Sequence, residues 1–226
     1  MPRPTVLRGF PLKTHPYTAA LLLAAAGAAQ ADVGLFNTGV DDHGVTLTTG
    51  AVDSHYQLVT ASGTASAFAV DDAAGYPGYW LAPSALSKWL SPVVSGGFAA
   101  SSDPGAVDYV YQTHFDLTGI DLSSALMTGK VVADNEVQDV LLNGHSIGFA
   151  TAVGYGSFTG FSIASGFVDG INTLAFRVGN YSGPTGLRTE LTGSFVTTAV
   201  PEPAAWATLA AGLLLLAVRR QRSSTP

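Results

Sequence analysis

The sequence predicts an all-β protein built around one β-sandwich or jelly-roll domain. Three observations lead to this prediction: short segments alternate apolar and polar residues, Gly, Pro and Asp turns separate them, and no stretch of the core keeps a helical period. The chain has 226 residues, with 26 glycines, 12 prolines and no cysteine. Without cysteine it can form no disulfide, zinc–thiolate site or iron–sulfur cluster.

The clearest strand pattern lies at 109–117, where aromatic and apolar residues take every second position and Gln112 and His114 face the other way. Further strands are predicted at 137–142, 145–149, 171–178 and 187–195, and weaker ones at 45–47, 56–59 and 67–70. Asn143-Gly144 joins two of these segments and is the strongest two-residue hairpin signal. This series of short strands is typical of a sandwich or jelly roll.

The N-terminal segment 1–31 has the pattern of a secretory signal peptide. Arg3, Arg8 and Lys13 precede an apolar run at 19–29, and Ala29-Gln30-Ala31 gives the small-x-small cleavage pattern. We therefore expect a signal-peptide helix before the mature domain.

The C-terminal segment 200–226 combines three features in a fixed order. Pro201-Glu202-Pro203 precedes an apolar run at 204–218, and Arg219, Arg220 and Arg222 follow it. This order resembles the PEP-CTERM sorting signal of Gram-negative bacteria. The resemblance implies a short transmembrane helix, removal of the tail by an exosortase protease, and a link to exopolysaccharide and biofilm. A plain membrane anchor is the alternative.

The domain between these ends, 32–199, also carries a family resemblance. Residues 139–148 contain a strand that ends in Asn143-Gly144, and residues 167–180 contain Asp169-Gly170-Ile171-Asn172 at the start of another strand. The pair is similar to the galactose-binding-like jelly-roll domain, which is common among carbohydrate-binding modules. Both motifs have structural explanations, because Asn and Gly adopt the backbone angles of tight turns and Asn closes a turn with its side chain.

The domain is strongly acidic. Between residues 32 and 200 there are four basic and fifteen acidic residues, a net charge of −11. Such a surface repels nucleic acid and anionic lipid and suits cations or neutral ligands. We therefore expect no nucleic-acid partner.

Aromatic residues gather in a Gly- and Pro-rich segment at 71–104. Flat rings stack on the apolar faces of sugars, while neighbouring polar groups bind the hydroxyls. The candidate ligand-binding residues are Tyr76, Tyr79, Trp80 and Trp89. The alternative is that Trp80 and Trp89 plug one end of the sandwich, since tryptophan is mostly buried.

Acidic residues offer ligands for a structural calcium ion, the one cofactor that the sequence suggests. Asp41, Asp42 and Glu190 could meet if the first and last strands pair, although no EF-hand spacing is present. No catalytic motif is recognisable, and the predicted domain has only two glutamates, Glu136 and Glu190, for a glycosidase pair. The sequence therefore predicts a protein that is not an enzyme.

Together these features predict a protein exported across the inner membrane of a Gram-negative bacterium and anchored there until an exosortase processes it. At the cell surface or outside the cell it would bind or organise extracellular polysaccharide. Its partners would be the secretion machinery, the exosortase and a glycan. The alternatives are a structural biofilm-matrix protein without a small-ligand site and a glycan-active enzyme.

Overall fold

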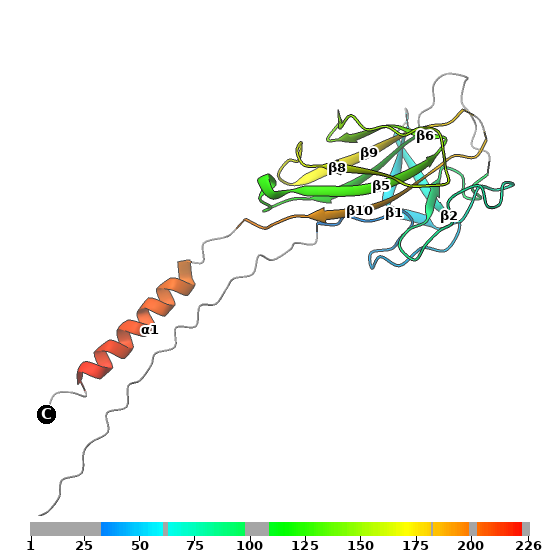
Figure 1. Ribbon diagram of the computed structural model, residues 1–226. Helices are drawn as coiled ribbons and strands as arrows, with labels where there is room; N and C mark the ends of the chain where they lie inside the picture. Colours follow the sequence, from blue (N-terminus) through cyan, green and yellow to red (C-terminus); the bar gives the residue numbers. More distant parts are fainter. Residues whose placement is uncertain (1–32, 61–62, 98–108, 182, 199–202, 223–226) are drawn as a thin grey trace, which may run out of the picture.

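The computed structural model describes residues 33–60, 63–97, 109–181, 183–198 and 203–222. Within these ranges ten strands form one sheet, and the helix α1 (Pro203–Arg222) follows it in the chain (Figure 1). The signal segment 1–31, Pro201 and Glu202 lie outside the described residues.

All strand pairs in the sheet are antiparallel. The strands are β1 (Val52–Thr60), β2 (Gly63–Val70), β3 (Trp89–Ser91), β4 (Tyr109–Asp116), β5 (Leu126–Asp134), β6 (Glu136–Leu142), β7 (His145–Ser146), β8 (Thr159–Ile163), β9 (Ile171–Gly179) and β10 (Gly186–Ser194). A 3₁₀ turn, η1 (Leu122–Ser124), precedes β5. The strand order is β7-β6-β9-β4-β1-β2-β3-β10-β5-β8.

The all-β prediction is confirmed, and most predicted strands exist. Those at 109–117, 137–142, 171–178 and 187–195 are β4, β6, β9 and β10. The segment at 45–47 contributes only an isolated bridge between Val40 and Thr46, and the return strand after Asn143-Gly144 is only β7. The structure adds β3, β5 and β8, which the sequence pattern did not reveal. The finer jelly-roll assignment stays a prediction.

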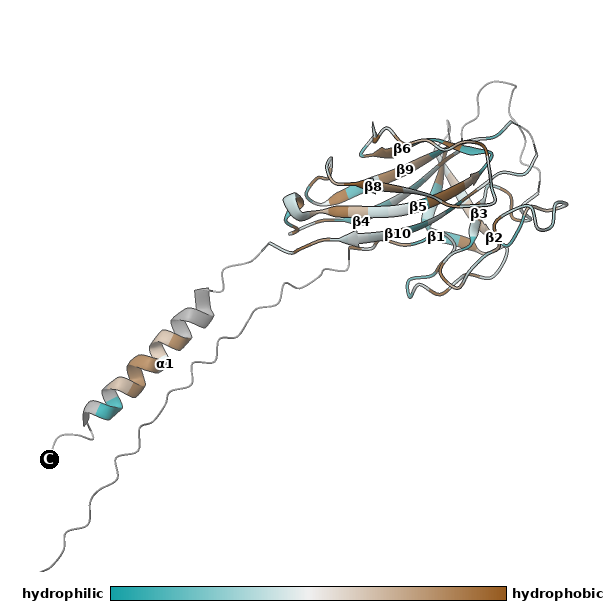
Figure 2. Cartoon of the chain, viewed as in Figure 1, coloured by the Kyte–Doolittle hydropathy of each residue, from teal (hydrophilic) through white to brown (hydrophobic). Residues whose placement is uncertain are grey.

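The sheet folds over on itself around a buried core, so that its two halves face each other as in a sandwich. β5 and β6 are consecutive in the chain, lie near opposite ends of the strand order, and still contact each other. Across the core, Phe161 of β8 packs edge-on against Phe176 of β9 with ring centroids 6.0 Å apart. Apolar residues follow the strands that enclose this core (Figure 2).

A second, smaller apolar cluster lies on the opposite face of β2, β3 and β5. Successive side chains of a strand point to opposite faces. On β3, Leu90 therefore joins the main core while Trp89 joins the second cluster, with Val70, Ala73, Trp80 and Val132. The loop between β2 and β3 covers this outer face, because it carries Ala73 and Trp80.

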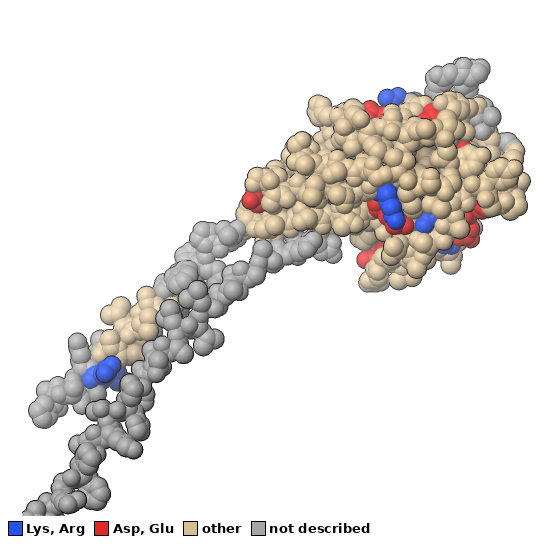
Figure 3. All heavy atoms as spheres, viewed as in Figure 1, with Lys and Arg blue, Asp and Glu red and all other residues tan. Residues whose placement is uncertain are grey.

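The helix α1 forms where the sequence placed its C-terminal apolar run, and it includes Pro203, Arg219, Arg220 and Arg222 of the sorting motif. Arg219 and Arg220 are exposed, and basic groups gather at this end of α1 (Figure 3). In the described part of the chain, no helix combines the length and the apolar character that crossing a membrane requires. The expected transmembrane helix is therefore not supported.

The two motifs that resemble galactose-binding-like domains meet at one end of β6 and β9. The amide of Asn143 donates to Asn172 Oδ1 at 2.9 Å, and Asn143 Oδ1 accepts from the backbone of Thr173 at 2.9 Å. Asn172 is fully buried and also binds Val168 and Gly170. Asn143 has φ 52°, the left-handed conformation that Asn tolerates. Both asparagines therefore act as structural residues.

We predict that Asn172→Ala destabilises the domain by about 2–4 kcal/mol, because several buried polar groups lose their partners. Urea unfolding of the full chain measures this change. Asp169→Ala is the control, because Asp169 is exposed in the same turn and makes one hydrogen bond, to Gly119 N at 3.3 Å. Equal losses in the two variants would contradict the structural role of Asn172.

Candidate functional site

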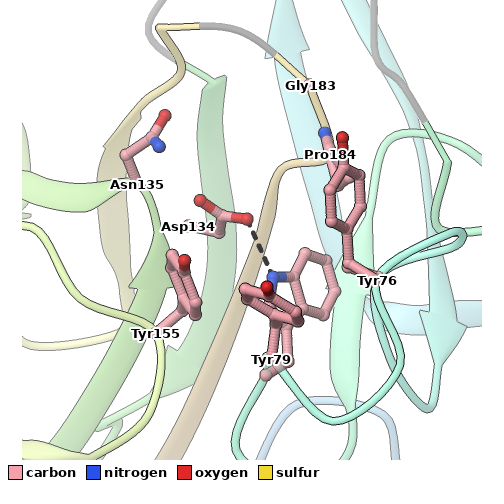
Figure 4. A pocket seen from close by; sticks show the side chains of 9 residues that line it. Tyr76, Tyr79, Asp134, Asn135, Tyr155, Gly183 and Pro184 are labelled. Atoms are coloured by element: carbon pink, nitrogen blue, oxygen red, sulfur yellow. Dashed lines mark hydrogen bonds between the residues drawn. The ribbon is translucent and has the colours of Figure 1, made fainter.

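A pocket of about 210 Å³ opens where several loops meet at one end of β5. Its wall combines aromatic rings with a carboxylate and an amide (Figure 4). The lining residues are Ala73, Tyr76, Tyr79, Trp80, Asp134, Asn135, Tyr155, Gly183 and Pro184. They come from the β2–β3 loop, the end of β5, the β5–β6 and β7–β8 connections and the β9–β10 loop.

Asp72 shapes the loop that presents the tyrosines. Its Oδ1 accepts from the backbone of Ala73 at 2.8 Å and of Trp80 at 3.3 Å, and its Oδ2 accepts from Gly78. One carboxylate thus binds three backbone N–H groups of the loop at 72–80. Leu81 N donates to Tyr155 O at 2.9 Å, which fastens this loop to the β7–β8 connection.

Trp80 and Trp89 form the base of the loop rather than its binding face. Their rings stack with centroids 4.4 Å apart, Trp80 is 4% exposed and Trp89 is fully buried. Trp89 Nε1 donates to Leu81 O at 2.8 Å. Trp89 therefore offers no face to a ligand, while Trp80 reaches the pocket wall. The pair covers the outer face of the sheet instead of plugging one end of the sandwich.

Tyr76 and Tyr79 lie where a ligand can reach them. They are 40% and 59% exposed, and their rings meet edge to face at 5.8 Å. Tyr155 joins them from a distant segment, with its ring centroid 6.4 Å from that of Tyr79. The structure thus brings three of the four predicted residues, Tyr76, Tyr79 and Trp80, together at the pocket and adds an aromatic residue that the sequence analysis missed. Its Gly-Tyr-Gly context was the available signal.

Asp134 is the charged group of the pocket. It is 7% exposed, and its Oδ2 accepts from Trp80 Nε1 at 2.8 Å. Burial raises the pKa of Asp134 above its ordinary value, and the hydrogen bond from Trp80 opposes this shift. Asn135, beside it, accepts at Oδ1 from Tyr181 N at 2.9 Å.

The predicted calcium ligands make other contacts. Asp41 Oδ1 accepts from the backbone of His43 and Val45, each at 2.9 Å, and closes a turn. Asp42 Oδ1 lies 2.9 Å from Nε2 of His55. Among the residues that the structure describes, no group of three or more His, Asp or Glu side chains could hold a metal ion. The calcium site stays a prediction without support from these contacts.

Glu190, the third predicted ligand, belongs to a charged cluster under the β2–β3 loop. Its Oε2 pairs with Lys130 at 2.8 Å and its Oε1 lies 3.5 Å from Arg188. Burial by itself raises the pKa of Glu190, but the bonds from Lys130 and Ser87 outweigh it, so the pKa lies below its ordinary value.

Arg188 is 1% exposed and fastens the same loop to β10. Its guanidinium donates to Leu81 O, Ala82 O and Ser84 Oγ, and its Nε donates to Ser87 Oγ at 2.8 Å. The cluster of Arg188, Lys130 and Glu190 therefore holds the loop that carries the pocket tyrosines.

Glu136, the other glutamate of the domain, is buried and does not line the pocket. Its Oε1 accepts from the hydroxyl of Tyr181 at 2.6 Å. The described wall of the pocket therefore contains one carboxylate, that of Asp134.

Comparisons with known proteins assign no family. No family model matches the chain, and no curated protein matches it. A solved structure described as a family 35 carbohydrate binding module from an environmental isolate is 11% identical, with a TM-score of 0.31 over 77% of this chain and 98% of that one. A likeness this weak indicates nothing about the function of this chain.

We predict that Glu190→Gln destabilises the protein by about 2 kcal/mol at pH 7, because buried Arg188 loses its counter-charge. The pKa of Glu190 in the folded protein lies below its ordinary value of 4.5. Its contribution is therefore complete above that pH and is lost as the pH falls through the folded pKa. Urea unfolding of both proteins between pH 7 and pH 3 should show the difference shrinking.

Asp169→Asn removes one exposed carboxylate outside this cluster and serves as the control. A difference between Glu190→Gln and the parent protein that stays constant from pH 7 to pH 3 would contradict the assigned ion pairs.

Proposed function

We propose that the protein is an exported, non-catalytic surface protein that binds extracellular polysaccharide at the tyrosine pocket. The observation that carries this proposal is the pair of exposed rings, Tyr76 and Tyr79, beside Asp134 and Asn135 in one pocket. Sugars present apolar C–H faces to aromatic rings and hydroxyls to carboxylate and amide groups. The volume of about 210 Å³ is below that of drug-sized sites and suits one sugar ring of a polymer.

The rigidity of the loop also supports binding. Asp72, Arg188 and the tryptophan pair hold the β2–β3 loop before any ligand arrives. A site that is already ordered loses less conformational entropy when it binds. Binding is favoured over hydrolysis because the described pocket wall contains one carboxylate, whereas glycosidases use two.

The export route rests on the two ends of the sequence. The segment 1–31 resembles a signal peptide, and Pro201-Glu202-Pro203 with the arginines of α1 resembles a PEP-CTERM sorting signal. We propose that an exosortase processes the chain near this motif and leaves the domain at the cell surface or outside it. The jelly-roll class of the domain belongs to the same proposal. Mass spectrometry of the secreted protein tests the route, and a mature protein that still carries Arg219, Arg220 and Arg222 would refute the processing.

We predict that Tyr79→Ala lowers polysaccharide affinity at least about tenfold and changes stability by less than about 0.5 kcal/mol, because the ring is exposed. A glycan array and polysaccharide pull-down with the full chain measure affinity, and urea unfolding measures stability. Trp89→Ala should instead cost about 3–5 kcal/mol of stability, as expected for a fully buried tryptophan.

Leu86→Ala is the matched control, because Leu86 lies in the same loop, is also 59% exposed and is outside the pocket. Affinity should be the same in this variant as in the parent. If no polysaccharide binds, or if Tyr79→Ala and Leu86→Ala behave alike, the binding site is refuted and a structural matrix role becomes the better hypothesis.

A further inference from the structure

The charge of the pocket limits which sugars it can bind. This inference rests on the proposed polysaccharide site. Among its described lining residues Asp134 is an acid, and none is lysine or arginine. The nearby cations are engaged elsewhere: Arg188 binds the backbone of the β2–β3 loop, and Lys130 pairs with Glu190. An anionic sugar would therefore meet a carboxylate with no balancing cation in the wall.

The two carboxylate oxygens of Asp134 differ in their contacts. Oδ2 accepts from Trp80 Nε1 at 2.8 Å, whereas no described residue donates to Oδ1. The backbone of Asp134 is held in place, since its carbonyl accepts from Thr185 Oγ1 at 2.5 Å. Asp134 is 7% exposed, and its burial disfavours the charged form of the carboxylate. A cationic donor at Oδ1 would form a charge-assisted hydrogen bond and oppose this effect.

The aromatic wall favours the same ligand charge. The faces of tyrosine rings carry negative quadrupole density, which attracts an ammonium group within about 6 Å of the ring centroid. Tyr79 lies within 6.4 Å of the rings of both Tyr76 and Tyr155, so several such faces border one small space. Figure 4 shows Asp134 above Tyr155 and Tyr79, with Tyr76 on the opposite side of the pocket.

We propose that this pocket binds an amine-bearing sugar, a pyranose with a protonated primary amine. The ammonium group donates to Asp134 Oδ1 and lies against the tyrosine faces, while the apolar face of the ring stacks on Tyr79. The net charge of −11 between residues 32 and 200 attracts a polymer of such units and raises its local concentration.

The test compares three oligosaccharides of equal length on the full chain by calorimetry. One is a β-1,4-linked glucosamine hexamer, the second is its fully N-acetylated form, and the third is a glucose hexamer. We expect the glucosamine hexamer to bind at least about tenfold more tightly than the other two, since acetylation removes the charge that Asp134 recognises.

Asp134→Asn removes the charge but keeps an oxygen that accepts from Trp80, so it should lower glucosamine affinity at least about tenfold and leave acetylated-sugar affinity within about twofold. Asp169→Asn removes the same charge from an exposed position outside the pocket and should leave both unchanged. Urea unfolding of the Asp134→Asn variant shows whether this variant folds. If it does not fold, the comparison of the three hexamers on the parent protein tests the amine preference.

The outcomes separate this inference from the proposed function. Equal binding of all three hexamers, lost in Tyr79→Ala, would overturn the amine preference and keep the polysaccharide site. Tight binding of poly-lysine that survives Tyr79→Ala would indicate general attraction of polycations and overturn the inference. No binding of any oligosaccharide or polysaccharide would refute both.

Discussion

The contact between Trp80 and Asp134 is the interaction on which the site depends. A carboxylate that leaves water needs a donor, and the indole N–H supplies it across 54 residues of sequence. Trp80 itself is held by stacking on Trp89, whose place is set by β3. Gly186 on β10 makes room for the ring, because a Cβ there would lie 2.8 Å from the Trp80 ring. The position of the acidic group therefore follows from the packing of two tryptophans on the outer face of the sheet.

Arg188 adds a second connection between the sheet and the loop. Alternation along β10 places Leu187 in the main core and directs Arg188 to the outer face, where a strand side chain is normally solvated. The β2–β3 loop covers that face and turns its own carbonyl groups toward the guanidinium. Burying this charge is tolerated because Glu190 and the loop acceptors satisfy it. The same residues thus serve stability and hold the pocket tyrosines.

The β2–β3 loop has a buried base, Trp80 and Trp89, and an exposed face, Tyr76 and Tyr79. This arrangement explains how a β-sheet can carry a binding site. The sheet supplies the fixed frame, and the loops at one end of β5 supply the groups that a ligand would touch. Tyr76 and Tyr79 are exposed and contribute little to the core, so a substitution at either position should affect ligand binding more than folding. Asp134 and Trp80 are buried, so any change in them acts on folding and on the site together.

The all-β class, four of the main strands and the Asn143-Gly144 turn could be predicted from the sequence, because strands buried on one face alternate visibly and Asn-Gly pairs suit tight turns. The sequence also located the aromatic loop. It did not reveal β5, which contains Gly129 and Lys130, residue types that are depleted in strands; the ring of Phe161 on β8 fills the space above Gly129. The burial of Trp89 on the outer face of the sheet, and the meeting of Tyr155 and Asp134 with Tyr79, depend on the tertiary structure, because strand register and loop packing, rather than local pattern, bring distant residues together.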